Sequence, residues 1–327
     1  MSLDSLNALV HLPSPLETLS NHSLLKNNIA VDVKRDDLIH PTLSGNKYRK
    51  LKGHIKKYSS TDYEGIITMG GAWSNHLHAT GWVCNQLGIS LQVIVRGPEP
   101  KHLSDTLSDI QAWGSEIEFV SRAEYRQLRE CYETQSKDVP PCLAKRPNHY
   151  FIPEGGRHKQ SLEGMAELAS ELEHTYDAVY MAVGTATTLA SLIAHWHNPA
   201  TIFNGILAID AEASQLQTLN LIAPDNSNPL LLRKDYLFGG YAKCSAELSE
   251  FIIATQQTYG LILEPVYTAK AFYALTEDVN SGRIKPNSRI LFIHSGGLQG
   301  LRGFSQYEFA AQLGIHSVLE NLPFKDH

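Results

Sequence analysis

The stretch AVYMAVGTATTLASLIAHW, residues Ala178 to Trp196, decides the fold class of this chain. An apolar run ends at Val183, Gly184 follows and a helical pattern then begins, which predicts a buried strand, a tight turn and a helix over residues 188–196. The free N–H groups of a first helical turn, with threonine hydroxyls beside them, suit one phosphate group. The alternative is a structural turn whose threonines only cap the helix. The turn matches neither GxxxxGK[ST] nor GxGxxG, which disfavours a nucleotide or dinucleotide.

Similar strand–turn–helix units occur on both sides of this stretch. MGGAWSNHLHATGW, residues 69–82, predicts a strand that ends in two glycines and a helix from about Asn75 to Leu87. Ser74 stands where it can either cap that helix or help to bind a carboxylate. LFIHSGGLQG, residues 291–300, places the hydroxyl of Ser295 at the carboxyl end of a strand. Strands alternate with helices along most of the chain, which predicts an α/β fold with a largely parallel sheet.

The domain boundary is predicted from a break in this alternation. The stretch KDVPPCLAKRPNHY, residues 137–150, contains three prolines, and we expect a junction near residues 138–155. A chain of 327 residues is long enough for two domains. We therefore expect a larger, discontinuous domain of residues 1–48 and 155–327, with a smaller α/β domain of residues 49–154 inserted in it.

The stretch LSGNKYRKLKGHI, residues 43–55, carries a run of cations. If a helix begins near Asn46, its apolar stripe includes Tyr48 and Leu51, and Lys47 lies about 60° from the centre of that stripe. Lys47 would then be the most interior cation of the run. Partial burial and the positive end of the helix dipole would favour a neutral amine, as a nucleophile or Schiff-base former requires. The competing interpretation is an ordinary solvated helix face.

Composition excludes several classes of function. The net charge of −6 and the isoelectric point near 6.2 disfavour binding to nucleic acids or anionic membranes. No apolar run approaches the roughly 20 residues of a membrane span, and the first residues do not resemble a signal peptide. The four cysteines are widely spaced, as in cytoplasmic proteins. The HxH pairs His76/His78 and His195/His197 lack an HExxH pattern, and we expect no metal site.

Together, the phosphate-binding turn and the early lysine predict pyridoxal 5′-phosphate, which has one phosphate and an aldehyde that reacts with a lysine. The segments SGNKYRKL, SNH, VGTATT, EPVYTAKA and LFIHSGG, in this order and spacing, resemble the fold type II (tryptophan synthase β-like) pyridoxal-phosphate enzymes. The resemblance is greatest to the 1-aminocyclopropane-1-carboxylate deaminase/D-cysteine desulfhydrase family and extends from about residue 10 to about residue 320. It implies a homodimer that acts on a small amino acid.

The resemblance also implies site residues. Lys47 would form the Schiff base and move the α-proton, and Ser295 would face the pyridine nitrogen. Lys50 would be a further phosphate contact, and Asn75 would bind the phenolic oxygen. The implied phosphate-binding residues are Gly184, Thr185, Ala186, Thr187 and Thr188. The implied substrate-binding residues are Ser74, Asn75, His76 and Thr268, and Tyr241 and Tyr267 would line the substrate side. The implied catalytic residues are Lys47, Ser74, Tyr241 and Tyr267. Either tyrosine could instead be a packed core residue.

Two positions bear on the substrate. Members of the family that open the cyclopropane ring resemble one another in an acidic residue where this chain has Thr268, and in a leucine where it has Ser295. We therefore expect α,β-elimination from D-cysteine to give pyruvate, sulfide and ammonia. The alternatives are 1-aminocyclopropane-1-carboxylate deamination to 2-oxobutanoate, and a non-catalytic cofactor-binding protein of the same fold. Four residues depart from the desulfhydrase pattern and leave the natural substrate open: Trp73, His78, Arg157 and His158.

Overall fold

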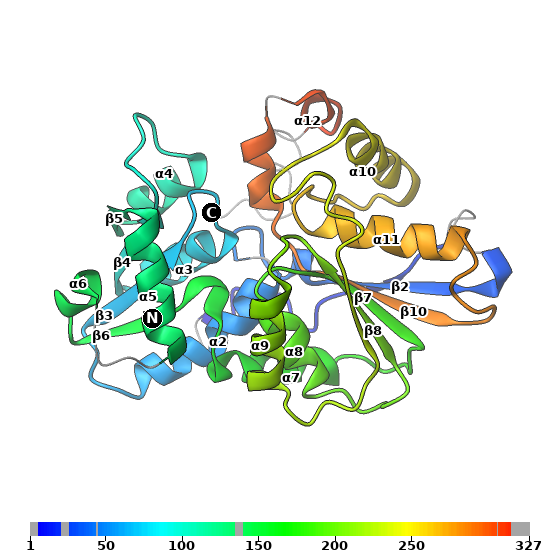
Figure 1. Ribbon diagram of the computed structural model, residues 1–327, viewed down its shortest axis with the longest axis horizontal. Coiled ribbons are helices and arrows are strands. Elements are labelled where there is room, and N and C mark those ends of the chain that lie inside the picture. The colour runs from blue at the N-terminus through cyan, green and yellow to red at the C-terminus, as the bar shows by residue number, and fades with distance from the viewer. Residues whose placement is uncertain (1–5, 21–25, 44, 135–139, 306, 315–327) are drawn as a thin grey trace. The chain divides into compact units, whose positions relative to one another are not determined.

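The computed structural model describes residues 6–20, 26–43, 45–134, 140–305 and 307–314. The chain divides into two compact units (Figure 1). The smaller unit contains the described residues up to Val10 and the segment Lys47–Gly164. The larger unit contains His11–Asn46 and the described residues from Met165 onward. Each unit has its own sheet and its own core, as an α/β architecture requires.

The larger unit is built on a six-stranded sheet with the order β1-β2-β10-β7-β8-β9. The strands are β1 (Leu16–Thr18), β2 (Ala30–Arg35), β10 (Arg289–His294), β7 (Ala178–Val183), β8 (Ile202–Leu207) and β9 (Leu230–Arg233). Only the edge strand β1 is antiparallel to its neighbour. The central strands β7 and β10 are almost wholly buried, as expected for parallel strands covered on both faces.

Helices cover both faces of this sheet. Figure 1 shows α10 (Ala246–Tyr259) and α11 (Thr268–Asn280) on one side, and α8 (Thr187–Ile193) and α9 (Glu212–Ile222) on the other. Apolar side chains of α10 and α11 pack on β2, β7 and β10, and the core there includes Val33, Tyr180, Phe272 and Phe292. The other helical segments are α12 (Glu308–Gln312), η1 (Lys26–Asn28), η2 (Asp36–Leu38) and η5 (Leu298–Phe304).

The smaller unit has a wholly parallel four-stranded sheet with the order β5-β4-β3-β6. Its strands are β3 (Gly65–Gly70), β4 (Ser90–Arg96), β5 (Glu116–Val120) and β6 (His149–Ile152). Its helical segments are α3 (Asn75–Leu87), α4 (Asp105–Ala112), α5 (Arg122–Thr134), α6 (Pro141–Ala144), η3 (Glu154–Gly156) and η4 (Lys159–Ser161). Two helices cross the unit boundaries, α2 (Asn46–Ser59) and α7 (Leu162–Ser170). No helix in the described residues is long and apolar enough to span a membrane.

The unit boundaries differ from the predicted domain boundaries in three places. Residues 155–164 belong to the smaller unit because they pack closely on α2: a Cβ at Gly53 would lie 1.9 Å from the Gln160 carbonyl oxygen, and one at Gly164 would lie 2.0 Å from the Arg49 carbonyl oxygen. The described residues up to Val10 also belong to the smaller unit, and so do residues 47 and 48, which were predicted to lie in the larger domain. Residues 137–139 of the proline-rich stretch lie outside the described residues. From Pro140 onward the stretch contains α6 and leads into β6, which pairs with β3.

Candidate active site

Asn46, the first residue of α2, joins two of the predicted site segments. Its backbone N–H donates to the carbonyl oxygen of Ser295 at 3.2 Å, and its side-chain amide donates to Oγ1 of Thr188 at 2.9 Å. Gly45 makes the approach possible, because a Cβ there would lie 1.9 Å from the Ser295 oxygen and its φ is +71°. Lys47 is the next residue in the chain. Its backbone is therefore attached to a residue that is fixed on both the 184–188 turn and the end of β10.

The turn of residues 184–188 provides donors for an anion. Ala186 is the N-cap of α8, with φ 60°, and it supplies no side-chain hydrogen bond to the helix. By contrast, Ser74 caps α3 and Ser245 caps α10 with their hydroxyls. A helix start without its own cap, at the positive end of the helix dipole, suits an external anion.

The hydroxyls of the turn and the residues around it complete this arrangement. Oγ1 of Thr185 and Oγ1 of Thr187 lie 3.0 Å apart, and Thr187 is fully buried. Nε2 of Gln215 donates to the Gly184 carbonyl at 2.8 Å. A Cβ at Gly184 would lie 3.2 Å from the ring of Tyr267, so the turn and this ring are already in close contact. The donor set therefore fits the phosphate of pyridoxal phosphate.

Glu264 fixes the start of α11, where Tyr267 and Thr268 lie. Its buried carboxylate accepts the backbone N–H groups of Val266, Tyr267 and Thr268 at 2.8, 2.7 and 2.7 Å. Burial raises the pKa of this carboxyl, and the three N–H bonds act against that rise. Oγ1 of Thr268 accepts the backbone N–H of Glu264 at 3.0 Å. The fully buried hydroxyl of Thr268 thus serves this turn in the structure.

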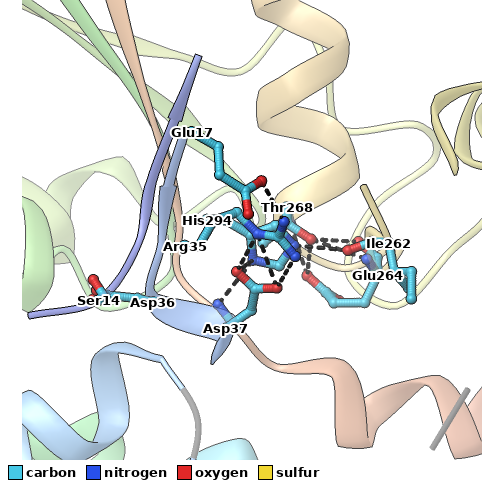
Figure 2. A network of polar contacts seen from close by, with 10 residues as sticks. Ser14, Glu17, Arg35, Asp36, Asp37, Ile262, Glu264, Thr268 and His294 are labelled. Atoms are coloured by element: carbon cyan, nitrogen blue, oxygen red, sulfur yellow. Dashed lines mark hydrogen bonds and ion pairs between the residues drawn. The ribbon is translucent and has the colours of Figure 1, made fainter. Parts of the chain in front are cut away.

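A second buried network holds the strand end before Ser295 (Figure 2). Nε2 of His294 donates to the Ile262 carbonyl at 2.7 Å, and its Nδ1 lies 3.4 Å from Oδ1 of Asp37. Asp37 in turn accepts three bonds from Arg35, two from Nε at 3.0 and 3.3 Å and one from Nη2 at 2.8 Å. Three residues of these networks were not predicted from the sequence: Arg35, Asp37 and Glu264. Nothing in their sequence neighbourhoods indicates that they converge on the predicted site segments. Ser295 itself is 9% exposed.

In the smaller unit, the cation run of α2 is buried differently from the prediction. Lys47 is partly exposed, whereas Arg49 and Lys50 are almost inaccessible, so the expectation that Lys47 is the most interior cation is wrong. The reason is that the 155–164 segment covers a further face of α2, and Nζ of Lys50 donates to the Gly155 carbonyl at 3.0 Å. Burial, and then the charge of Lys47, lower the pKa of Lys50 well below its usual value. A nearby anion would reverse that effect.

Ser74, Asn75 and His76 lie at the start of α3, as predicted. Oγ of Ser74 accepts the backbone N–H of Leu77 at 3.3 Å, which is the capping bond. His76 is 2% exposed, and its Nε2 lies 2.8 Å from Oγ1 of Thr68. Burial, followed by the charges of Lys47 and other nearby cations, lowers the pKa of His76 well below its usual value. The neutral ring of His76 therefore adds no positive charge at this helix start, where the free backbone N–H groups are the donors for a carboxylate.

The four residues that depart from the family pattern all lie in the smaller unit. His78 faces α4, with its Nε2 3.0 Å from Asp109 and its ring 4.9 Å from that of Trp113. Trp73, by contrast, is 41% exposed. The Arg157 carbonyl accepts a bond from Tyr132, and the ring of His158 packs near that of Tyr132 at 6.0 Å. Trp73 is therefore the departure with the most accessible side chain.

His76 and His78, the first HxH pair, lie in α3 of the smaller unit. His195 and His197 follow α8, which ends at Ile193 and not at residue 196 as expected. Nδ1 of His195 lies 2.9 Å from the Ser191 carbonyl. Within the described ranges, no three His, Cys, Asp or Glu side chains are grouped so that they could hold a metal ion.

The sequence and the fold are similar to those of known pyridoxal-phosphate-dependent enzymes. Residues 8–296 match the family model described as "Pyridoxal-phosphate dependent enzyme". The chain is 29% identical to the bifunctional D-cysteine desulfhydrase/1-aminocyclopropane-1-carboxylate deaminase of Arabidopsis thaliana mitochondria, over 98% of this chain and 85% of that protein. It is 31% identical to a proposed 1-aminocyclopropane-1-carboxylate deaminase of Thermotoga maritima, over 88% of this chain and 95% of that protein.

A solved structure described as an ACC deaminase homologue is also similar, with a TM-score of 0.74 and 25% identity over 96% of this chain and 99% of that one. Threonine deaminase isoform 2 of Solanum lycopersicum shares the fold, with a TM-score of 0.61 and 17% identity over 96% of this chain and 90% of that one. The chain belongs to the fold type II pyridoxal-phosphate-dependent enzymes, in the 1-aminocyclopropane-1-carboxylate deaminase/D-cysteine desulfhydrase family. Pyridoxal phosphate is the cofactor of this family.

Proposed function

We propose that this protein is a lyase that converts D-cysteine and water to pyruvate, hydrogen sulfide and ammonia. The choice of substrate rests on two hydroxyl residues, Thr268 and Ser295. Ring-opening members of the family resemble one another in an acidic residue at the first of these positions and a leucine at the second. A hydroxyl beside the pyridine nitrogen supports positive charge there less than a carboxylate does. Elimination of a β-thiolate needs less stabilisation of the carbanion than ring opening does.

Lys47 is the proposed attachment and proton-transfer residue. Its amine would hold the cofactor covalently, and the free amine would accept the α-proton of a bound amino acid as a general base. When bound, pyridoxal phosphate supplies an electron sink that stabilises negative charge at the substrate α-carbon. The attachment of Asn46 to Thr188 and Ser295 supports this role, because it fixes the backbone immediately before Lys47.

The remaining residues bind and orient. Residues Gly184 to Thr188 and the ammonium of Lys50 would bind the phosphate. Ser295 would face the pyridine nitrogen, and Asn75 would donate to the phenolic oxygen. Ser74, Asn75 and the backbone N–H of His76 would bind the substrate carboxylate, as the positive end of that helix favours. Tyr241, Tyr267 and Thr268 stand on the substrate side.

The second candidate activity is the deamination of 1-aminocyclopropane-1-carboxylate to 2-oxobutanoate and ammonia. It is favoured by the names of the relatives, one of which carries both activities. Incubation with each substrate, followed by identification of the keto acid, separates the candidates. Pyruvate and sulfide from D-cysteine, with no 2-oxobutanoate from the cyclopropane, support the proposal, and the reverse result refutes the argument from Thr268 and Ser295. The Thr268→Glu/Ser295→Leu double variant is expected to suppress desulfhydration.

The attachment residue is tested separately. Borohydride reduction of the cofactor-loaded protein is expected to fix the cofactor on the peptide that contains Lys47, as read by mass spectrometry. Lys47→Ala is expected to lower turnover by several orders of magnitude for every substrate, since both the covalent link and the base are lost. Lys57, exposed on the same helix, is the matched control, and Lys57→Ala should leave turnover unchanged. An adduct on another lysine would contradict the assignment.

We also propose a cytoplasmic homodimer. Cys84 and Cys142 are buried thiols whose pKa is raised by burial, as suits reduced cysteines in that compartment. The dimer follows from the family resemblance. Sedimentation equilibrium on the loaded protein tests it, and a single species with the 36.3 kDa mass of one chain would refute it.

A further inference from the structure

Lys270, in the first turns of α11, is a buried charged residue outside the site described above. The residue is fully buried, and its Nζ donates to the carbonyl oxygens of Leu237 and Gly240 at 2.9 and 3.0 Å. A buried ammonium is costly unless its donors are satisfied. Here the acceptors lie in one loop, so the energy of these bonds depends on the shape of that loop.

The loop of residues 237–242 has an unusual backbone. Phe238, Gly239, Gly240 and Ala242 all have positive φ, at 48°, 85°, 117° and 54°. Phe238 and Ala242 are strained in this region, because they carry a Cβ. Such a backbone persists only where its surroundings hold it. The Lys270 ammonium contacts both ends of the 237–240 turn, and the Gly240 N–H closes the turn on the Leu237 carbonyl at 3.0 Å.

The residue that follows this turn is Tyr241. Its side chain is 49% exposed, and its ring centroid lies 6.4 Å from that of Tyr267, at an interplanar angle of 72°. Tyr267 directly precedes α11 and contacts Gly184 of the phosphate-binding turn. Both tyrosines are thus held near the start of α11. The Glu264 carboxylate accepts the backbone N–H of Tyr267, and the Lys270 ammonium donates to the carbonyl of Gly240, the residue before Tyr241.

We propose that Lys270 is a positioning residue that holds Tyr241 at the substrate side of the site by bonding the 237–240 turn. The role of Tyr241 rests on the proposed function. Lys270 itself touches neither Tyr241 nor the phosphate-binding turn through its described hydrogen bonds; it acts through the loop backbone. Its bonds also hold the loop to α11, a helix whose apolar side chains are packed in the core.

Lys270→Met tests the proposal, since methionine keeps most of the volume and removes all three donors. Lys243 is exposed just beyond the loop, so the rate of tryptic cleavage after it in the folded protein reports loop opening without any need for activity. We expect Lys270→Met to speed this cleavage at least about tenfold, as for loss of roughly 1.4 kcal/mol of local stability.

The matched control is Lys34→Met, which removes another buried lysine of the same unit that donates to a carbonyl, that of Ser14, at 2.6 Å. The two variants are compared at equal folded fractions, and Lys34→Met is expected to leave cleavage after Lys243 at the wild-type rate. Equal acceleration in both variants, or no acceleration in Lys270→Met, overturns the proposal. This result stands even if no amino acid proves to be a substrate, which separates it from a failure of the proposed function.

The route through Tyr241 is tested by a double-mutant cycle with the substrate identified above. Lys270→Met is expected to raise KM about tenfold with a smaller change in kcat, as is typical when a positioned binding group is loosened. In a Tyr241→Ala background the same change should cause no further loss, because the two residues act as one unit. Additive losses in the double variant would overturn the proposed route.

Discussion

The side-chain amide of Asn46 donates to the hydroxyl of Thr188 at 2.9 Å, although 142 residues separate them in the chain. The same residue bonds the Ser295 carbonyl through its backbone N–H. One buried residue therefore fixes the turn of residues 184–188, the end of β10 and the chain just before Lys47. Because the parallel strands β7 and β10 are neighbours in the sheet, their carboxyl ends bring these segments together.

Asn46→Ala is expected to weaken cofactor binding while the fold is retained. One neutral hydrogen bond contributes about 1 kcal/mol, so the dissociation constant of pyridoxal phosphate should rise roughly five- to tenfold. Titration by absorbance measures it. The control is Asn148→Ala, which removes an exposed side-chain amide that bonds Glu64, and it should leave the dissociation constant unchanged. Unaltered cofactor affinity in Asn46→Ala would show that the bond to Thr188 does not organise the turn.

Glu264→Gln is expected to destabilise the protein by about 2–3 kcal/mol, because a single amide oxygen cannot serve three buried backbone donors. Urea unfolding of the protein, followed by circular dichroism, measures the change. Glu247→Gln is the matched control at the start of α10, where the carboxylate is exposed and bonds Tyr273, and its effect should be within about 0.5 kcal/mol. A loss of less than about 1 kcal/mol in Glu264→Gln would contradict the prediction.

The sequence predicted the parts of the site that follow from local pattern. The turn after Val183 and the start of α3 at Asn75 could be read directly, because an apolar run, glycine and hydroxyl residues mark them locally. The assignment of residues 155–164 to the smaller unit could not be predicted from the sequence, since it depends on close packing at two glycines, Gly53 and Gly164, against distant segments. Periodicity also failed for Arg49 and Lys50: it describes one apolar face, and α2 is covered on more than one.

Charged networks were the hardest part to foresee. Arg35 ends β2 and Asp37 follows it in η2, but His294 ends β10, which pairs with β2 only in the folded sheet, so no spacing along the chain links His294 to the other two. Lys270 and Glu264 fall inside the quoted segment EPVYTAKA, yet their partners, the loop carbonyls and the backbone N–H groups, carry no sequence pattern at all. Only the backbone conformation shows what these side chains bind.

His54 is expected to make stability fall in acid. Burial lowers its pKa to about 3 from 6.5, while its ring bonds Tyr150 and the Gly156 carbonyl. Because the folded pKa lies below the unfolded value, the unfolded chain binds more protons between these limits. The contribution of neutral His54 is therefore present above pH 6.5 and is lost as the pH falls toward about 3, at up to ~1.4 kcal/mol per pH unit.

The variant His54→Gln should reduce this slope by about one proton, as measured by urea unfolding at a series of pH values. His197→Gln, at an exposed position, is the control and should keep the wild-type slope. If the slopes of the His54 variant and the wild type coincide below pH 6.5, the buried imidazole is not the source of the acid sensitivity.

His76 is expected to be a neutral imidazole with its proton on Nε2. Thr68 donates its hydroxyl proton to the Ile152 carbonyl at 2.9 Å, so the hydroxyl oxygen must accept from Nε2 of His76 at 2.8 Å. Nδ1 then carries the lone pair, and it has no hydrogen-bond partner among the described residues. Burial, and then the charge of Lys47, keep the pKa of His76 well below 6.5. A substrate carboxylate at this helix start would therefore bind the backbone N–H groups and not this ring nitrogen.

Nitrogen-15 NMR of the histidine rings measures the tautomer directly. In the wild type we expect a protonated Nε2 and an unprotonated Nδ1 for His76 at pH 7, with no change to imidazolium as the pH falls below 6.5 while the fold persists. Thr68→Ser keeps the hydroxyl and should preserve this spectrum. Thr68→Val removes the acceptor and should let both tautomers appear, since nothing then selects Nε2. An Nδ1–H tautomer or an imidazolium in the wild type at pH 7 would refute the assignment. The Nδ1–H group of His76 could then donate a hydrogen bond to the substrate carboxylate.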